Sequence, residues 1–197
     1  MNKFKFGKKQ LLLVLFLISL ISILYIYLKV SKSSKKPTVT PTPIVQGTDQ
    51  VASFKEITPG ITSLDRVNEL LGYPVDAKLS GNQEIDSYKT DNPNRFNTVI
   101  SENGQVKMVR EEMTEVNQKA DEIRKTYGIA PFVLYSKDPS SVFDLFVYLK
   151  NGIAFKGHSD GTVLEIWYFE PMDSIDKFIL TWAKDYSKEK SKEIPRY

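Results

Sequence analysis

The chain has 197 residues, contains no cysteine and one histidine, and carries a formal net charge of +3. Without cysteine it has neither a disulfide framework nor a lipidated cysteine, and a single histidine leaves it without the usual ligands of a zinc site. Eight of the 27 basic residues precede residue 37, whereas all 24 acidic residues follow it. Residues 37–197 therefore carry 19 basic and 24 acidic side chains, a net charge of −5, which argues against binding to nucleic acid.

An apolar segment follows a basic tail at the N-terminus. Residues 1–10 form the tail, and residues 11–28 read LLLVLFLISLISILYIYL, eighteen residues without a charge. At about 1.5 Å per residue, a helix of this length spans most of a bilayer core of about 30 Å. The alternative is a cleaved signal peptide, but its apolar region is usually about 7–15 residues long and ends in a small-x-small site, which is absent here. We expect an uncleaved transmembrane anchor.

Residues 29–53 form a linker rich in Lys, Pro and Thr. Four lysines on each side of the apolar segment leave its orientation undecided by charge. The stretch KPTVTPTPIVQG, at 36–47, is typical of an extended, solvated stalk. We therefore expect a single-pass protein of the cell membrane whose C-terminal domain lies outside the cytoplasm.

The first predicted element of the domain is a helix in LDRVNELLGYP, residues 64–74. Its apolar residues recur at helical spacing, with Gly72 as the stop and Pro74 beyond it. Thr62 is the expected N-cap. The same pattern returns in ADEIRKTYGIAP at 120–131, in which Gly128 takes the place of Gly72. The recurrence predicts two structural repeats.

Each predicted helix precedes a set of strands. Strands are expected at 83–90, 95–101 and 105–113 in the first repeat, and at 142–150, 153–157 and 162–170 in the second. Asn103-Gly104 and Asn151-Gly152 predict hairpin turns, although their offset is 48, whereas that of the two helix patterns is 56. The prediction is an α+β fold, a two-layer sandwich of tandem helix-plus-antiparallel-meander repeats at 54–115 and 116–171, after the N-terminal transmembrane helix.

Residues 172–197 are predicted to form a third helix and a tail. Asp173 is the expected N-cap. One apolar stripe runs along this helix, and its members are Ile175, Phe178, Ile179, Trp182 and Tyr186.

PGITSLDRVNELLGYP, with its PG-x-T entry, its V-x-x-x-L-G-x-P exit and the meander that follows, resembles the outer-membrane lipoprotein family called small protein A, part of the β-barrel assembly machine. The similarity covers about residues 57–75. Over residues 76–170 the duplicated layout looks like the related β-lactamase-inhibitor-protein architecture. The resemblance implies this fold and an extracytoplasmic adaptor role.

No motif in the sequence indicates catalysis. GIAFKGHS, at 152–159, nearly matches a phosphate-binding loop, but His158 stands where the lysine belongs. HSDG, at 158–161, has the composition of a turn. Glu111, Glu112 and Glu115 lack the spacing of a calcium loop, and a solvated charge run is the favoured interpretation. We therefore expect no cofactor, no metal site and no enzymatic activity.

Aromatic residues in two strands are the candidate partner-binding site. They alternate with charged residues and are predicted to share the sheet face opposite the repeat helices: Phe146, Tyr148, Trp167 and Phe169. The alternative is that the C-terminal helix covers them. The favoured function is a membrane-anchored, extracytoplasmic protein-binding or envelope-assembly module. A membrane-anchored hydrolytic or cell-wall-modifying enzyme with an unrecognised site is the alternative.

Overall fold

The computed structural model describes residues 50–114 and 119–190. The chain divides into two units, residues 1–43 and 44–197, and all described residues belong to the second. The predicted tail, transmembrane anchor and most of the linker lie outside the described residues, as does Glu115. Across the described ranges, no helix has the length and apolarity needed to cross a membrane.

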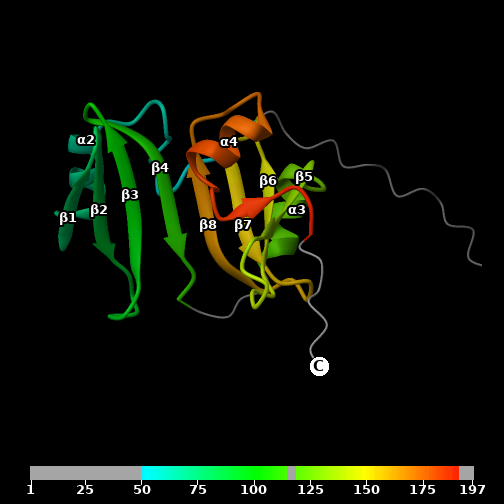
Figure 1. Cartoon of the computed structure of the whole chain (residues 1–197). Coiled ribbons are helices and arrows are strands. Elements are labelled where there is room, and N and C mark those ends of the chain that lie inside the picture. The colour runs from blue at the N-terminus through cyan, green and yellow to red at the C-terminus, as the bar shows by residue number, and fades with distance from the viewer. Residues whose placement is uncertain (1–49, 115–118, 191–197) are drawn as a thin grey trace, which may run out of the picture. The chain divides into compact units, whose positions relative to one another are not determined.

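The described residues form an α+β fold with three helices and a large antiparallel sheet (Figure 1). The first helix and its strands are α2 (Leu64–Leu71), β1 (Asp76–Ser80), β2 (Gln83–Lys89), β3 (Phe96–Glu102) and β4 (Gln105–Glu112). The second set is α3 (Ala120–Tyr127), β5 (Phe132–Ser136), β6 (Asp144–Tyr148), β7 (Ile153–Gly157) and β8 (Val163–Phe169). The chain continues through α4 (Ile175–Thr181) and β9 (Tyr186–Ser187).

The two sets of strands enter the sheet from opposite edges. The strand order is β1-β2-β3-β4-β8-β7-β6-β5-β9, and every neighbouring pair is antiparallel. Each helix is thus followed by four strands in a meander, not the three expected from the sequence. The last strands of the two meanders, β4 and β8, pair at the centre.

The sequence offset between the two helices also relates their first strands. Adding 56 to the residue numbers of α2 gives those of α3, and adding 56 to those of β1 gives those of β5. The two Asn-Gly pairs are not equivalent, because Asn103-Gly104 joins the third strand to the fourth, whereas Asn151-Gly152 joins the second to the third. The offset of 48 between the two Asn-Gly pairs therefore relates two different turns of the meander, so it does not argue against the repeat.

The ends of α2 show why its glycine is required. Ser63, not the predicted Thr62, is the N-cap, and its hydroxyl accepts a hydrogen bond from the Arg66 N–H. Thr62 is buried, and its hydroxyl accepts from the Thr58 N–H instead. Gly72 has φ 82° and ψ −171°, and Gly128 at the end of α3 has φ 81° and ψ −158°. Both conformations are essentially restricted to glycine.

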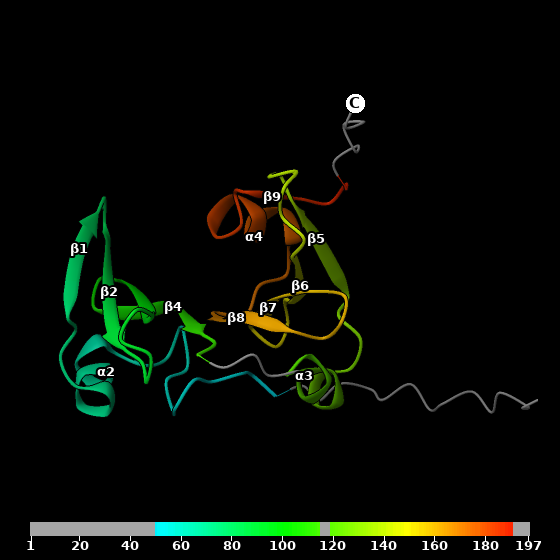
Figure 2. The ribbon, with the colours of Figure 1, turned by 90° about the horizontal axis from the view of Figure 1, so that it is seen from below.

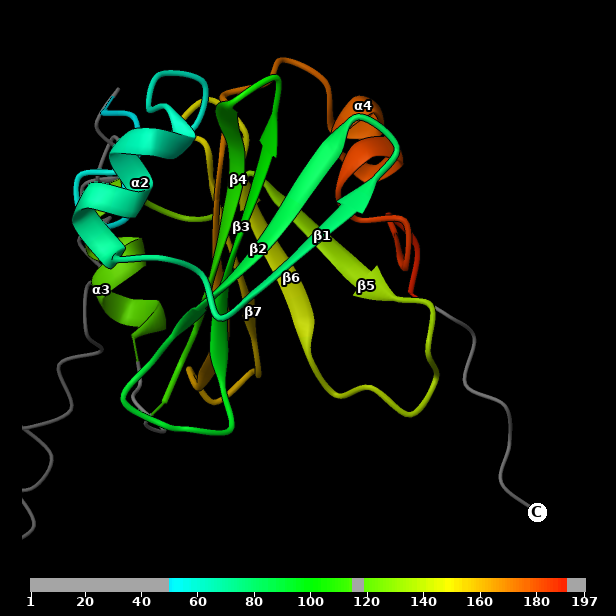
Figure 3. The same cartoon turned by 90° about the vertical axis from the view of Figure 1, so that its left-hand side faces the viewer.

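The helices cover the two faces of the sheet unequally. Figures 2 and 3 show α2 and α3 on one face of the curved sheet and α4 on the other, which we call the convex and concave faces. Val67 of α2 and Ile123 of α3 are buried against the convex face, in separate clusters. Phe178 of α4 is buried against Trp167 and Phe169 on the concave face. Two helices therefore support the convex face and one supports the concave face.

The third helix is shorter than predicted. Ser174, not Asp173, caps it, and its hydroxyl accepts a hydrogen bond from the Lys177 N–H. The helix ends at Thr181, so Tyr186 lies in β9 and not in the helical stripe. From this strand, Tyr186 packs edge-to-face on Trp167 at 6.2 Å between ring centroids.

One buried carboxylate is expected to make stability depend on pH. Asp86 is 2% exposed, and its Oδ1 atom has no hydrogen-bond partner among the described residues. Burial, and then Glu84, raise the pKa of Asp86. A raised pKa means that folding favours the protonated acid, so its stabilising contribution is present below the ordinary pKa near 4 and is lost as pH rises through the raised value. Asp86→Asn should therefore gain stability relative to the natural chain over that interval, by about 1 kcal/mol at neutral pH.

Urea unfolding at a series of pH values measures this difference. Asp91→Asn, in an exposed loop, is the matched control and should change little. A pH dependence that Asp86→Asn leaves intact would contradict the assignment.

Candidate functional site

The four aromatic residues predicted to share one face lie on two. In the register of the sheet, Phe146 opposes Phe155, and Trp167 opposes Ala154. Because residues 154 and 155 are consecutive in one strand, their partners point to opposite faces. Phe146 and Tyr148 therefore face α3, whereas Trp167 and Phe169 face α4, and the prediction of a common face is wrong.

The surroundings of these residues agree with this register. The Tyr148 hydroxyl donates to the Gly128 carbonyl oxygen at 2.9 Å, and Phe146 stacks on Phe155 at 4.7 Å. Phe169 packs on Phe178 of α4, also at 4.7 Å. Tyr148, Trp167 and Phe169 are at most 4% exposed. They offer a partner no exposed patch, and for Trp167 and Phe169 the cover is the C-terminal helix.

Part of the concave face of the N-terminal meander is covered by no helix among the described residues. The register places Ser87 opposite Thr98, and Thr98 opposite Arg110. Arg110 in turn opposes Trp167, which sets the face as the one that carries α4. We call this surface the open concave face, and it comprises Lys78, Ile85, Ser87, Thr98 and Arg110. Lys78 is exposed and the other four are partly buried.

Arg110 is the charged centre of the open concave face. Its guanidinium carbon lies 4.5 Å from the centroid of the Trp167 ring, a cation–π arrangement. Its Nε atom is buried and has no hydrogen-bond partner within the described ranges. The carboxylates of Glu112 and Glu165 lie nearby in the sheet, but each forms an ion pair with a cation other than Arg110. Glu112 lies 3.2 Å from Arg95 Nη1, and Glu165 lies 3.3 Å from Lys156 Nζ.

The Trp167 indole beside Arg110 is held by a hydrogen bond, and the Tyr186 ring packs against it. Trp167 Nε1 donates to Glu165 Oε2 at 2.8 Å. Burial raises the pKa of Tyr186 to about 12, with Glu165 adding to the rise and Arg110 opposing it. Tyr186 is therefore a neutral hydroxyl at physiological pH. The guanidinium of Arg110 lies over the Trp167 ring, and a planar guanidinium can bind a carboxylate through two parallel hydrogen bonds.

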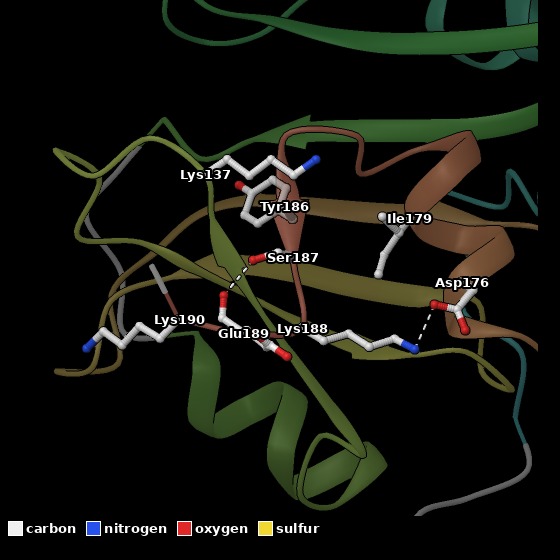
Figure 4. A pocket seen from close by; sticks show the side chains of 8 residues that line it. All are labelled: Lys137, Asp176, Ile179, Tyr186, Ser187, Lys188, Glu189 and Lys190. Atoms are coloured by element: carbon white, nitrogen blue, oxygen red, sulfur yellow. Dashed lines mark hydrogen bonds and ion pairs between the residues drawn. The ribbon is translucent and has the colours of Figure 1, made fainter. Parts of the chain in front are cut away.

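Two cavities lie beside α4. One, of about 400 Å³, is a groove between α4 and the ends of β2, β3 and β4, and Gln83, Glu102, Lys107, Lys177 and Trp182 are among the residues that line it. The other, of about 610 Å³, lies between α4 and β9 (Figure 4). There Lys188 pairs with Asp176 at 2.6 Å, and Tyr186 and Ile179 form part of the lining. The smaller cavity, the groove, separates α4 from the meander that carries the open concave face.

The segment with residue types of a hydrolase triad is a turn. The Asp160 N–H donates to His158 Nδ1 at 3.3 Å, and the Thr162 N–H donates to Asp160 Oδ1 at 2.9 Å. These contacts close the connection between β7 and β8, as its composition predicted. Glu111 accepts a hydrogen bond from the Tyr168 hydroxyl at 2.8 Å. Within residues 50–114 and 119–190, no three His, Cys, Asp or Glu side chains group as metal ligands.

Comparisons with known proteins assign no family. No family model matches the chain, and no curated protein matches it. Among solved structures, a cysteine-rich secretory protein from Staphylococcus aureus matches with a TM-score of 0.44 and 11% identity, over 68% of this chain and 50% of that one. An extracellular protein containing a SCP domain from Bacillus anthracis matches at 0.44 and 14%, over 73% and 55%.

A third solved structure is a DUF4309 family protein from Bacillus subtilis. Its TM-score is 0.42 and its identity 16%, over 59% of this chain and 84% of that one. The chain thus spans about half the length of the first and second of these neighbours. Similarities at this level assign neither a family nor a function.

Proposed function

We propose that this chain is a membrane-anchored, extracytoplasmic module that binds a partner protein through the open concave face and catalyses no reaction itself. The apolar segment 11–28 and the Pro/Thr-rich linker support the anchor and the location. The resemblance of residues 57–75 to small protein A supports a role in envelope assembly. In the part of the chain that the structure describes, the open concave face combines a charged centre with a sheet surface that no helix covers.

Arg110 is the observation that carries the proposal. A half-buried guanidinium without a carboxylate partner among the described residues has an unmet demand for an anion. The guanidinium of Arg110 already lies 4.5 Å from the centroid of the Trp167 ring, so a carboxylate of a partner can bind with two parallel hydrogen bonds and little loss of side-chain entropy. We therefore infer that the partner presents an Asp, a Glu or a C-terminal carboxylate to this face.

Site-specific photocrosslinking in cells tests the proposal. A benzophenone side chain replaces Ser87, on the open concave face, or the exposed Lys125 of α3, on the convex face, as the control. We expect a discrete adduct from position 87 that position 125 does not give. Arg110→Glu should reduce that adduct at least about tenfold, because it leaves the partner's carboxylate beside a like charge.

The controls separate loss of binding from loss of folding. Urea unfolding of Arg110→Glu should show a folded domain, and Arg110→Lys should retain part of the adduct because it keeps the charge without the planar fork. An adduct that Arg110→Glu leaves unchanged, or the same product from both positions, would refute the proposal.

Protease accessibility tests the location of the domain. Protease added to intact spheroplasts should cut within the linker at 29–53 and release the folded domain, since exposed extended segments are preferred sites of cleavage. Lysed cells provide the control for protease activity. Complete protection until lysis would place the domain in the cytoplasm and reverse the proposed orientation.

A further inference from the structure

The strand β1 forms one edge of the sheet and is exposed along its whole length. It pairs with β2 on one side, and all five of its residues are exposed. An edge strand of this kind presents alternate backbone N–H and C=O groups away from the sheet, where another strand can pair with them. At the opposite edge, β9 is two residues long. The β1 edge is therefore the one long enough for extended pairing.

The side chains of β1 and the residue before it separate by type onto two faces. Val75, Ala77 and Leu79 occupy one face, and Val75 and Leu79 are 46% and 82% exposed. Asp76 and Lys78 occupy the other, where Lys78 Nζ lies 2.8 Å from Asp76 Oδ2. The edge thus carries an apolar row on one side and one charge of each sign on the other.

We propose that β1 pairs with β1 of a second copy of this chain, antiparallel, about a two-fold axis at Ala77. In this register Ala77 meets Ala77, Val75 meets Leu79, and Asp76 meets Lys78 of the second copy. The pairing forms two Val–Leu contacts on one face and two ion pairs on the other, and opposite-charge pairs stabilise antiparallel strands relative to Ala–Ala pairs. The strand is complementary to itself in both charge and hydrophobicity.

The neighbouring symmetric registers are excluded by charge. An axis at Lys78 would bring the two Lys78 ammonium groups together, and an axis at Asp76 would do the same with two carboxylates. Like charges directly opposite each other destabilise a strand pair. A lysine on an edge strand usually discourages pairing, but here it discourages the wrong registers and favours one. Pro74, which has no backbone N–H, stands at the limit of the five-residue ladder.

Disulfide trapping in a chain without native cysteine tests the register. In the full-length protein in native membranes, Ala77→Cys should form a disulfide-linked dimer on mild oxidation. Its Cα atoms would lie about 4.5–5.5 Å apart, within the range of a disulfide. Leu79→Cys is the matched control and should not crosslink to itself, because four residues of offset separate its copies by about 14 Å. A mixture of Val75→Cys and Leu79→Cys should give the heterodimer.

A charge exchange tests the ion pairs independently. Lys78→Asp should raise the dissociation constant of the dimer about tenfold or more, as measured by sedimentation in detergent, because both ion pairs become repulsive. Combining it with Asp76→Lys should restore the natural value. These residues are exposed, so urea unfolding of each variant should match that of the natural chain.

Several results would overturn the proposal. These are equal crosslinking at all positions, strongest crosslinking from Lys78→Cys, no dimer at any position, or a cysteine at position 77 that couples to a different protein. Failure to rescue by the double exchange would overturn it as well. The proposal does not rest on Arg110, so Arg110→Glu should leave the dimer intact, although the dimer contact shares Lys78 with the open concave face.

Discussion

Gly152→Ala is expected to destabilise the domain by roughly 3–5 kcal/mol. Gly152 has φ 65°, and a Cβ atom at this position would lie 2.2 Å from the Phe169 carbonyl oxygen and 3.3 Å from Pro171 Cδ. The Phe169 N–H donates to the Gly152 carbonyl oxygen at 2.8 Å, so the two backbones are held together at this point. The added methyl group must separate β8 from the turn between β6 and β7, as well as strain its own backbone.

Gly104→Ala is the matched control. Gly104 also has a positive φ, 74°, but no heavy atom lies within 4 Å of the added Cβ. It should therefore lose only the conformational part, about 1 kcal/mol. Urea unfolding followed by tryptophan fluorescence measures both variants. Equal losses would mean that the backbone near Phe169 moves to accommodate the methyl group.

Gly152 illustrates how much of the fold the sequence predicts. The Asn-Gly pair identified a turn from local preference alone, and the turn is present. The second reason for the glycine, the approach of the β8 backbone, depends on contact with a strand outside this hairpin and has no local signal. Local sequence also could not align the two repeats beyond their helices. Asn103-Gly104 and Asn151-Gly152 have the same local preference for a turn but occupy different turns of the meander.

Besides the short β9, the sequence analysis missed the first strand of each meander. β1 reads DAKLS, contains no β-branched or aromatic residue, and is exposed on both faces, so it lacks the alternation that identifies a half-buried strand. β5 reads FVLYS and does have strand-forming residues, but it is a run of five between Pro131 and a polar loop. Runs this short cannot be assigned from periodicity alone.

The prediction that four aromatic residues share one sheet face is wrong for a different reason. The prediction treats charged residues in β6 and β8 as marks of a solvent face, but helices cover both faces of these central strands. Asp144 and Glu165 lie on strands whose neighbours bury them partly, and burial raises the pKa of Asp144. The sequence does show that Met108, Arg110 and Glu112 fall at alternate positions of one expected strand. The sequence does not show which carboxylate forms an ion pair with which cation, nor that Arg110 has no carboxylate partner among the described residues. Both depend on the pairing of β4 with β8.

Duplication and the single C-terminal helix together account for the open surface. Among the described residues, the convex face has one helix for each meander, α2 and α3, whereas the concave face has α4, whose Phe178 packs on Trp167 and Phe169 of the C-terminal meander. Within residues 50–114 and 119–190, part of the concave side of the N-terminal meander is consequently left uncovered. A repeat that is symmetric in its strands thus becomes asymmetric in its exposed surface, and Arg110 lies where the covered and uncovered halves meet.

Tyr148→Ala is expected to cost roughly 3–5 kcal/mol of stability, because it removes a large side chain that is 1% exposed. Its ring packs against Tyr127 of α3 at 5.9 Å between centroids, and its hydroxyl hydrogen-bonds to the carbonyl oxygen of Gly128, where α3 ends. Tyr148 therefore joins β6 to the last turn of its repeat helix. The cavity left by alanine would lie between sheet and helix, with the Gly128 carbonyl unpaired.

Tyr148→Phe separates the two contributions, since it keeps the ring and removes the hydroxyl. It should cost only about 1 kcal/mol, the ordinary net value of one hydrogen bond. Tyr73→Ala is the control, because Tyr73 is 88% exposed and its loss should leave the urea midpoint unchanged. If Tyr148→Ala retained full stability while abolishing the crosslink from Ser87, Tyr148 would belong to the partner-binding surface after all, contrary to its place beneath α3.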